Sequence, residues 1–448
     1  MRTVDVVIVG AGPAGSAAAI TLRRAGRSVI VIDKAMFPRD KICGDGLTAG
    51  ALRTLESLDL QPETVGSWQP VDDVVVHSPA GRSVVFPLPR GQGQFAVVAR
   101  RADLDAALVD VARSKGATIC EGHAFAGIET FDDHVVVHAD GLSSIAARYV
   151  VGADGMWSPL RKALGAHVDG YLGEWHAFRQ YFHSVGPRAA AELHVWFEPD
   201  LLPGYAWSFP LPGARANVGF GIQRGARQRT SDMKRLWPEL LTRPHIRAIL
   251  GEAATPESPH RAWPIPARID NMQLSAGRAL FVGDAAAATD PMTGEGIGQA
   301  LTSGILAANA IIAAGALDAE YAARDYEARV HRHLVADHRA SAQLVKVLAR
   351  QRGAETAVRI AGMTGWTRRN FARWLFEDYP RAVLLTPKRW QRAMFSGRGT
   401  FERTSTRPSV LRGDLRPIDG AKADAVREIH PVAGPGEAGH HANRTERS

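Results

Sequence analysis

The segment Val4-Asp-Val-Val-Ile-Val-Gly-Ala-Gly-Pro-Ala-Gly15 runs from a β-branched stretch into three glycines with the spacing G-x-G-x-x-G. The stretch from Val4 to Val9 predicts a buried parallel strand. An Ala-rich helix is predicted to follow it, from Ser16 to about Ala25. A strand, a glycine-rich turn and a helix in this order place the N-terminus of the helix where it can face phosphate groups.

Each glycine of this segment has its own part in the predicted turn. Gly10 permits the tight turn, Gly12 lets the backbone approach a pyrophosphate, and Gly15 lets helix and strand pack closely. A second predicted strand, Ser28–Ile32, ends at Asp33, whose carboxylate can bind both hydroxyls of a ribose. The glycine spacing alone is a weak signal, but the two strands, the helix and the acid together predict a dinucleotide site.

A related pattern lies far along the chain, in Phe281-Val-Gly-Asp-Ala-Ala-Ala-Ala-Thr-Asp-Pro-Met-Thr-Gly-Glu-Gly-Ile-Gly298. A predicted strand, Ala279–Val282, turns at Gly283, and Asp284 is then placed to meet a hydroxyl of a bound cofactor. A third segment, Val150-Val-Gly-Ala-Asp-Gly-Met-Trp-Ser-Pro-Leu-Arg161, again puts a strand before an Asp-Gly turn. We therefore expect distant parts of the chain to grip the two ends of one cofactor.

The order and spacing of these segments resemble the three fingerprints of the para-hydroxybenzoate hydroxylase-like flavoprotein superfamily. The resemblance covers roughly residues 1 to 320 and implies that the cofactor is FAD. It implies an α/β fold, with a Rossmann-like FAD-binding domain of the glutathione-reductase-2 or para-hydroxybenzoate hydroxylase type, a sheet-rich substrate domain and a C-terminal helical segment. Arg101 matches the arginine that opens the helix beneath the flavin in that family. The implied cofactor-binding residues are Gly10, Gly12, Pro13, Ala14, Gly15, Asp33, Lys34, Cys43, Gly44, Asp45, Gly46, Arg101, Asp154, Gly283, Asp284, Pro291, Gly294, Gly296, Ile297 and Gly298.

Two further segments narrow the choice within this superfamily. Pro38-Arg-Asp-Lys-Ile-Cys-Gly-Asp-Gly-Leu47 resembles the P-x-x-x-x-C-G motif of the geranylgeranyl reductases. Gly204-Tyr-Ala-Trp-Ser-Phe-Pro210 resembles their Y-x-W-x-F-P substrate motif. Alternate residues of a strand share one face, so this segment predicts an aromatic wall suited to a long polyprenyl chain. The implied substrate contacts are Tyr205, Trp207, Phe209 and Pro210.

The same resemblance implies catalytic positions at Cys43, Tyr205 and Trp207. An unactivated isoprenoid double bond needs a hydride at one carbon and a proton at the other, and reduced FAD would supply the hydride. We expect Tyr205 to be a proton donor and Cys43 to be a redox or positioning residue. Structural alternatives remain open, with Cys43 as a small buried side chain and the aromatic stripe as ordinary core packing.

The segment from Trp366 to Trp390 is similar to the tail of actinobacterial geranylgeranyl-reductase-type proteins, which include the menaquinone reductases. The predicted activity is FAD-dependent reduction of a carbon–carbon double bond, in the polyprenyl side chain of menaquinone or in a geranylgeranyl group. The alternative is an FAD-dependent aromatic hydroxylase (a monooxygenase) that uses NAD(P)H and O₂. A halogenase is disfavoured because no lysine lies between Lys41 and Lys115. No motif favours a non-enzymatic flavin-binding protein.

No second domain for a nicotinamide nucleotide is recognised in the sequence. The predicted electron donor is therefore NAD(P)H, docking transiently, or a ferredoxin-like carrier.

The composition is that of a soluble globular protein, with 448 residues, 45% hydrophobic and 22% charged. The two cysteines, Cys43 and Cys120, lie in different predicted elements, so we expect no disulfide and a reducing cytoplasm. No spacing of His and Cys predicts a metal site. Ile297–Leu317 is apolar, but it follows the Gly-Asp segment directly and is better explained as a buried helix than as a membrane span.

The net charge of +8 is not accompanied by a nucleic-acid-binding motif. Basic residues alternate with aromatic ones in the C-terminal part, as at the surface of an anionic membrane. We therefore expect a cytoplasmic protein with peripheral contact to the inner face of the plasma membrane. A solvated helical face packed on the core by its aromatics is the alternative. The residues are Arg368, Arg369, Arg373, Lys388, Arg389, Arg392 and Arg398, with Phe371, Trp374, Phe376, Trp390 and Phe395.

The predicted organisation is discontinuous. Residues 1–70, 96–165 and 275–325 are expected to form the FAD-binding domain. Residues 71–95 and 166–274 are expected to form the substrate domain, which places its sheet over the flavin. A helical region is predicted over 326–403 and a disordered tail over 404–448.

Overall fold

The computed structural model describes residues 2–315, 318–376, 380–382 and 398–401. These residues belong to one unit, Met1–Ser405, and the second unit, Thr406–Ser448, lies wholly outside them. The predicted disordered tail therefore lies outside the described residues, as do Lys388, Arg389, Trp390, Arg392 and Phe395.

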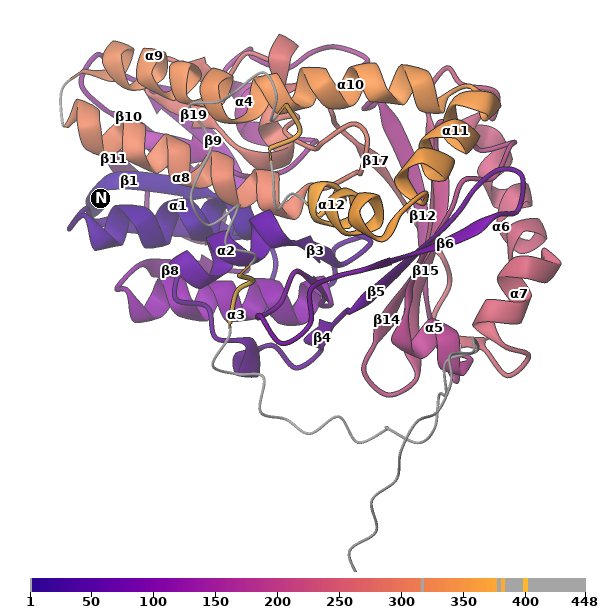
Figure 1. The fold of residues 1–448 in the computed structure, drawn as a ribbon. Coiled ribbons are helices and arrows are strands. Elements are labelled where there is room, and N and C mark those ends of the chain that lie inside the picture. Colours follow the sequence, from indigo (N-terminus) through magenta and orange to yellow (C-terminus); the bar gives the residue numbers. More distant parts are fainter. Residues whose placement is uncertain (1, 316–317, 377–379, 383–397, 402–448) are drawn as a thin grey trace, which may run out of the picture. The chain divides into compact units, whose positions relative to one another are not determined.

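The first sheet is built around β1 (Arg2–Val9). β1 pairs in parallel with β2 (Val29–Asp33) on one side and with β11 (Ile145–Gly152) on the other. β2 continues in parallel to β8 (Thr118–Glu121), and β11 continues to β19 (Ala279–Phe281). The strands that precede the three sequence segments are thus neighbours in one sheet, whose carboxyl ends meet at one edge (Figure 1). The remaining strands of this sheet are β9 (Phe125–Thr130), β10 (Val135–Ala139) and β18 (Ser275–Ala276).

Helix α1 (Pro13–Arg24) packs between α3 (Arg101–Ser114) and α8 (Ile297–Ala314). A Cβ atom at Gly304 would lie 2.1 Å from the Ala14 carbonyl oxygen, so only glycine allows α8 to lie this close to α1. Among the described helices, α8 alone is long and apolar enough to cross a membrane, with a mean hydropathy of 1.5. Since 61% of it is buried, it is a core helix that joins α1 to α9 (Ala319–Val330).

The second sheet has the order β16-β12-β15-β14-β13-β5-β6, and β17 pairs with β12. Its strands come from two distant parts of the chain, because β13 pairs in parallel with β5. The bounds are β5 Asp73–His77, β6 Ser83–Pro87, β12 Trp175–His183, β13 Leu193–Trp196, β14 Tyr205–Leu211, β15 Arg215–Gln223, β16 Thr255–Pro256 and β17 Arg261–Ile265.

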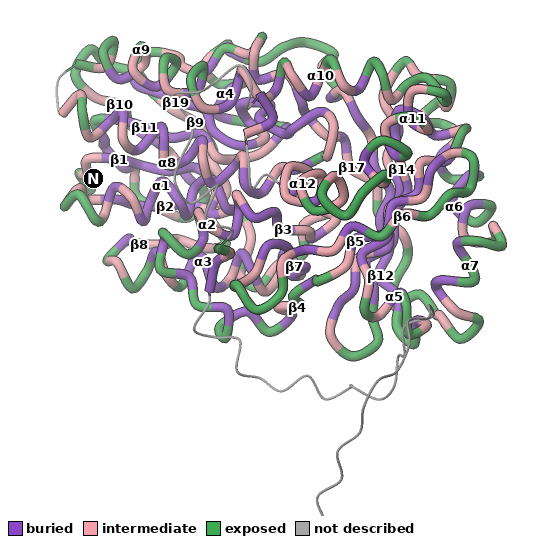
Figure 2. Tube along the Cα trace, viewed as in Figure 1, coloured by how far each residue is buried: buried purple, intermediate pink, exposed green. Residues whose placement is uncertain are grey.

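The two faces of this sheet differ in chemistry. On β12, Phe178 and Phe182 belong to an apolar cluster with α6 (Met233–Thr242) and α7 (Pro244–Leu250). Arg179 and Tyr181 on β12 point to the opposite face, since successive side chains of a strand alternate. That opposite face is turned toward the first sheet, and buried residues run along both sheets (Figures 1 and 2).

Short elements complete the described part of the chain. A small antiparallel sheet joins β3 to β7 and β7 to β4. After α8, α9 packs on α8 beside the first sheet, and α10, α11 and α12 lie over the region between the two large sheets (Figure 1). The bounds are β3 Gly46–Thr48, β4 Gln69–Pro70, β7 Ala96–Val98, α2 Ala49–Ser57, α4 Pro159–Ala163, α5 Pro187–Ala191, α10 Ala336–Leu348, α11 Gln351–Ala361 and α12 Gly365–Leu375.

One predicted boundary needs correction. Helix α1 begins at Pro13 and not at Ser16, because proline fits the first turn of a helix, where no N–H donor is needed. Helix α8 begins at Ile297, where the apolar segment begins, so Gly294 and Gly296 precede it and Gly298 lies within its first turn.

Candidate active site

A large cavity of about 790 Å³ is lined by residues of both large sheets. It begins at the carboxyl ends of β1 and β2, passes the face of β14, and ends among α10, α11 and α12. Residues from all three sequence segments and from both reductase-like motifs line it. The volume is typical of a site for a small molecule or cofactor.

The turn after β1 has the geometry that its glycines predict. Gly10 has φ of +101°, and a Cβ atom there would lie 2.3 Å from the Ala153 carbonyl oxygen. A Cβ at Gly15 would lie 1.9 Å from the Gly10 carbonyl oxygen. At Gly12, in contrast, the nearest atom is Nη2 of Arg39 at 3.6 Å, so the space above the helix is open. The turn is therefore tight on its protein side and free on its cavity side.

The N-terminus of α1 meets this open space. No side chain caps α1 within the described residues, so its first N–H groups are available to an anion. Asp33 lies beside them and accepts the N–H groups of Ala11 and Ala35, both at 2.8 Å, which fixes the direction of its carboxylate. An open helix N-terminus with a fixed acid beside it fits the pyrophosphate and ribose of FAD.

Asp154 lines the same end of the cavity, from the segment after β11. Its Oδ2 accepts the N–H of Leu160 at 3.0 Å, whereas its Oδ1 is buried without a hydrogen-bond partner in the described part of the chain. Burial raises the pKa of Asp154. A buried acceptor left open on a cavity wall is the kind of group that a hydroxyl-bearing cofactor would satisfy.

A buried ion pair lies beneath the middle of the cavity. Arg101 donates to both carboxylate oxygens of Asp105, at 2.8 and 2.7 Å, and Arg39 approaches the same carboxylate at 2.8 Å. Burial alone would lower the pKa of Arg101, but Asp105 outweighs this effect and raises it. The guanidinium therefore stays charged at the position that the family resemblance assigns to the helix beneath the flavin.

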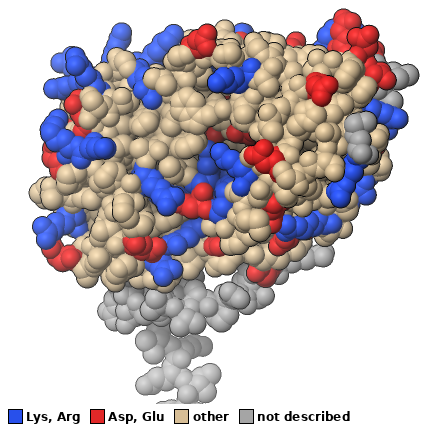
Figure 3. Space-filling view, turned by 180° about the vertical axis from the view of Figure 1, so that it is seen from behind, with Lys and Arg blue, Asp and Glu red and all other residues tan. Residues whose placement is uncertain are grey.

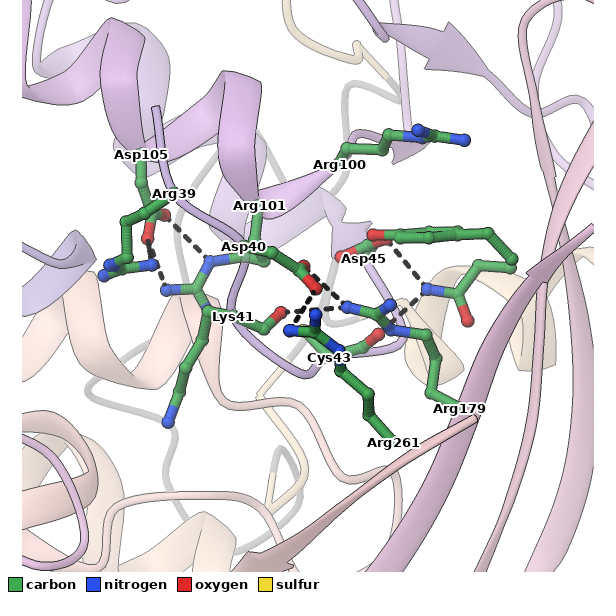
Figure 4. A network of polar contacts seen from close by, with 12 residues as sticks. Arg39, Asp40, Lys41, Cys43, Asp45, Arg100, Arg101, Asp105, Arg179 and Arg261 are labelled. Carbon is green, nitrogen blue, oxygen red and sulfur yellow. Dashed lines mark hydrogen bonds and ion pairs between the residues drawn. The ribbon is translucent and has the colours of Figure 1, made fainter. Parts of the chain in front are cut away.

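More cations surround the mouth of this region. Arg179 and Arg261 share Asp40, at 2.7 and 3.3 Å, as Figure 4 shows. Lys41 lies 3.6 Å from Asp284 and 4.0 Å from the ring centre of Trp263. From behind, Lys and Arg side chains are seen around a hollow with several carboxylates among them (Figure 3). The polar end of the cavity thus carries cations and carboxylates in close pairs, and its guanidinium and ammonium groups are possible partners for phosphate oxygens.

The loop after Cys43 turns back under the second sheet at Asp45, which has φ of +65° and no exposed surface. Oδ2 of Asp45 accepts a hydrogen bond from the Tyr181 hydroxyl at 2.6 Å and another from Nδ2 of Asn217 at 2.8 Å (Figure 4). Nδ2 of Asn217 also donates to the Cys43 carbonyl oxygen at 2.8 Å. Burial raises the pKa of Asp45 to about 6.

The aromatic stripe of β14 forms one wall of the cavity. The ring centres of Tyr205, Trp207 and Phe209 are each 6.1 Å from the next along the strand. A Cβ atom at Gly44 would lie 3.4 Å from the Phe209 ring, and one at Gly46 would lie 3.2 Å from it. The glycines therefore let the loop lie against this wall, which is both packed core and cavity lining.

Two candidate catalytic groups are held in neutral form. Burial raises the pKa of the Tyr205 hydroxyl, which donates to the Thr293 carbonyl oxygen. Burial raises the pKa of the Cys43 thiol to about 11. Tyr205 therefore has its proton engaged by the backbone, and Cys43 carries no thiolate near neutral pH.

Beyond the aromatic wall the cavity becomes an apolar arm. We use this name for the part lined by side chains of β5, β13, α10, α11 and α12. Its members are Val74, Val76, Leu193, Val195, Phe197, Leu344, Val347, Leu348, Ala357, Val358, Phe371, Trp374, Leu375 and Phe376.

Most residues that the sequence singled out lie together on this cavity. Gly15, Pro210, Pro291 and Gly298 do not line it. Gly15 and Gly298 serve helix packing, since a Cβ at Gly298 would lie 3.2 Å from Ala51 on α2.

Other polar groups of the site were not predicted. Asp105 was not singled out, although it follows Arg101 by one helical turn. Asn217 and Tyr181 were missed too, because no local spacing shows which strands will face the Cys43 loop.

The FAD binding domain family model matches residues 3–332 of the chain. A menaquinone reductase of Mycobacterium tuberculosis is 35% identical over 334 residues, covering 68% of this chain and 75% of that protein. Digeranylgeranylglycerophospholipid reductase 1 of Methanopyrus kandleri is 30% identical over 318 residues, covering 69% of this chain and 80% of that protein.

A solved structure has the same fold. It is a geranylgeranyl bacteriochlorophyll reductase-like protein from Thermoplasma acidophilum, with a TM-score of 0.68 and 20% identity. The match covers 89% of this chain and 96% of that one.

Proposed function

Because the chain belongs to the FAD-dependent oxidoreductases of the geranylgeranyl reductase family, we propose that it saturates a carbon–carbon double bond in the polyprenyl side chain of menaquinone. The observation that carries this proposal is the continuity of the cavity. Residues that fit FAD line one end of it, and the apolar arm begins at the aromatic wall of β14. A long hydrocarbon chain is a ligand that such an arm accommodates without burying unpaired polar groups.

When bound and reduced, FAD supplies a hydride equivalent. The residues of the chain bind and orient its partner. Trp207 and Phe209 present flat apolar surfaces to the substrate, and the aromatic and aliphatic residues of the arm exclude water from the double bond. Arg101, held by Asp105, provides a fixed positive charge beneath the same region.

The electrons come from NAD(P)H or from a ferredoxin-like carrier, and anaerobic mixing distinguishes the two donors. Bleaching of the flavin by NADPH or NADH alone would identify the nucleotide. Bleaching only with reduced ferredoxin would identify the carrier. Of the cations at the polar end of the cavity, Arg261 has the most exposed side chain, at 56%, and it could contact either an anionic nucleotide or an acidic protein.

We further propose that the protein is cytoplasmic and contacts the inner face of the plasma membrane. Val347 lines the apolar arm and is 50% exposed, so the arm reaches the surface at α10. Near the α11–α12 turn, Ile360, Met363 and Trp366 are 53, 68 and 68% exposed. Together with Val347 we call them the exposed apolar patch. Large exposed apolar side chains on and beside the helices that line an apolar cavity suit a lipid surface.

The sequence had pointed to other aromatics for this contact. Phe371, Trp374 and Phe376 are directed inward and line the arm, so their contribution is to the cavity. Within the described residues, the basic side chains that accompany the patch are Arg350, Arg352, Arg359 and Arg369, all exposed.

The test is mass spectrometry of lipid quinones in the host with this gene deleted. Loss of the form that is two hydrogens heavier, with accumulation of the fully unsaturated form, supports a menaquinone side-chain reductase. Unchanged quinones would contradict that substrate. Assays of the purified protein with geranylgeranyl lipids, and with aromatic acids under O₂, then separate another polyprenyl substrate from an aromatic hydroxylase.

A further inference from the structure

Asp45 is a carboxyl group that lines the reaction cavity, and the family resemblance placed it among the cofactor-binding residues without giving its carboxyl a chemical role. Its side chain has no exposed surface. It lies between Gly44 and Gly46, the two residues that let the loop lie against Phe209. It therefore lies close to the place where the double bond would be held.

The hydrogen bonds of Asp45 distinguish its two oxygens. Both the Tyr181 hydroxyl and the Asn217 amide donate to Oδ2. Oδ1 is buried and has no hydrogen-bond partner in the part of the chain that the structure describes. When the carboxyl is protonated, the proton must therefore be on Oδ1, because Oδ2 already accepts two donors. The protein thus holds a proton at one defined atom.

The surroundings of Asp45 favour a carboxyl that is partly protonated near neutral pH. Burial raises its pKa to about 6, although the charges of Arg179 and Arg101 and the hydrogen bonds from Tyr181 and Asn217 all act to lower it. Cys43 also faces it, with a thiol pKa of about 11. A carboxylic acid is a far better proton donor than this thiol or a tyrosine hydroxyl.

We infer that Asp45 donates the proton that completes reduction of the double bond, from Oδ1, and that Asn217 and Tyr181 are positioning residues. This inference rests on the proposed function. The hydride forms a C–H bond at one alkene carbon and the Oδ1 proton forms a C–H bond at the other, as the π bond breaks. The two electrons come from reduced FAD, and solvent returns a proton to the Asp45 carboxylate. Tyr205 is thereby replaced as the expected donor, since its hydroxyl proton is engaged by Thr293.

The first experiment is a single turnover of Asp45→Asn. Enzyme with reduced FAD is mixed with menaquinone in detergent without oxygen, and flavin absorbance reports its reoxidation. The wild-type rate constant is expected to fall as pH rises through about 6, since the donor must be protonated. In Asp45→Asn it is expected to be slower by about 10²–10⁴-fold and to lose this dependence. An unchanged rate and pH profile would overturn the inference.

A second pair of variants tests the arrangement around Oδ2. Tyr181→Phe removes a hydrogen bond that stabilises the charged carboxylate, so the fall in rate is expected at higher pH. The matched control is Tyr326→Phe, which removes another buried hydroxyl, one that donates to the Phe281 carbonyl oxygen. A profile unmoved in Tyr181→Phe, or moved equally in both, contradicts the assigned role.

A third readout does not depend on turnover. Infrared titration of the resting protein should show a protonated carboxyl band that disappears as pH rises through about 6 and is missing in Asp45→Asn. Absence of that band in the wild type overturns the inference. Failure of the wild type to turn over any polyprenyl substrate would instead refute the proposed function, and the inference with it.

Discussion

Trp207 joins the aromatic wall to the loop that carries Asp45. Its Nε1 donates to Oδ1 of Asn217 at 3.1 Å, and a Cβ at Gly219 would lie 2.3 Å from its ring. Asn217 in turn holds both Cys43 and Asp45. This one indole therefore shapes the cavity and fixes the hydrogen-bonding direction of the amide beneath it.

Replacing Trp207 by Phe should destabilise the protein through that amide. The change leaves Oδ1 of Asn217 buried without this donor, which costs about 1–3 kcal/mol beyond the lost packing. Trp175→Phe is the control, because Trp175 is equally buried and its Nε1 has no partner among the described residues. Urea unfolding should show the larger loss for Trp207→Phe, and equal losses would contradict the account.

Asp105 is predicted to be the most sensitive carboxylate of α3. Asp105→Ala leaves the Arg101 guanidinium buried and unpaired, which costs about 3–5 kcal/mol. The variant should also bind FAD more weakly, as measured by the ratio of flavin to protein absorbance. Asp110→Ala removes an exposed partner of Arg113 on the same helix and should change stability by less than about 1 kcal/mol. A similar loss of unfolding free energy in both variants would show that burial of the Arg101–Asp105 ion pair does not affect stability.

Elements with a local signature were predictable from the sequence. The α/β fold class and the FAD cofactor are confirmed. They could be predicted because β-branched runs, glycine spacing and an Ala-rich helix are patterns formed by residues that are close in the sequence. The division into two domains stays a prediction. The partners of Asp45 escaped prediction because β12 and β15 reach the Cys43 loop only through the tertiary fold.

The C-terminal helices show the limit of composition as a guide. Their basic and aromatic content suggested a membrane surface, but composition does not say which side of a helix faces inward. Phe371 and Trp374 of α12 line the cavity, whereas Trp366 in the first turn of α12 and Met363 just before the helix are exposed. Which side chains of α12 face the cavity and which face solvent is decided by the packing of α12 against β6.

The exposed apolar patch predicts binding to anionic vesicles. Replacing Met363 and Trp366 together by Ser should lower co-sedimentation with phosphatidylglycerol vesicles by about tenfold or more, because each large apolar side chain contributes about 1.5–3 kcal/mol when buried. The control is Phe131→Ser with Leu172→Ser, which removes two side chains of similar exposure elsewhere. Equal binding by both double variants would contradict the assignment of the patch.

On the scale of the whole chain, residues 398–401 return to the body formed by the N-terminal part. Thr400 forms a bridge with Gln94, and the Phe401 ring meets Trp68 edge to face at 5.5 Å. The N–H of Phe401 donates to Glu56 at 2.8 Å.

A chain that ends at Gly397 should therefore lose about 3 kcal/mol of stability, in the range expected for removing a buried Phe. A chain that ends at Ser405 keeps all of these contacts and should unfold at the same urea concentration as the full protein. Equal midpoints for the two truncated chains would show that the returning segment contributes nothing.

The order of strands in the first sheet has a consequence for biosynthesis. β11 lies between β1, which ends at Val9, and β19, which ends about 270 residues later at Phe281. At roughly 5–20 residues per second, the ribosome works for tens of seconds before that strand emerges. Throughout this time the part of β11 that pairs with β19 remains an unpaired edge, and α8 has not yet been synthesised to pack against α1. We expect the nascent polypeptide to depend on a holding chaperone until translation passes α8, and its yield in cells to respond to chaperone supply.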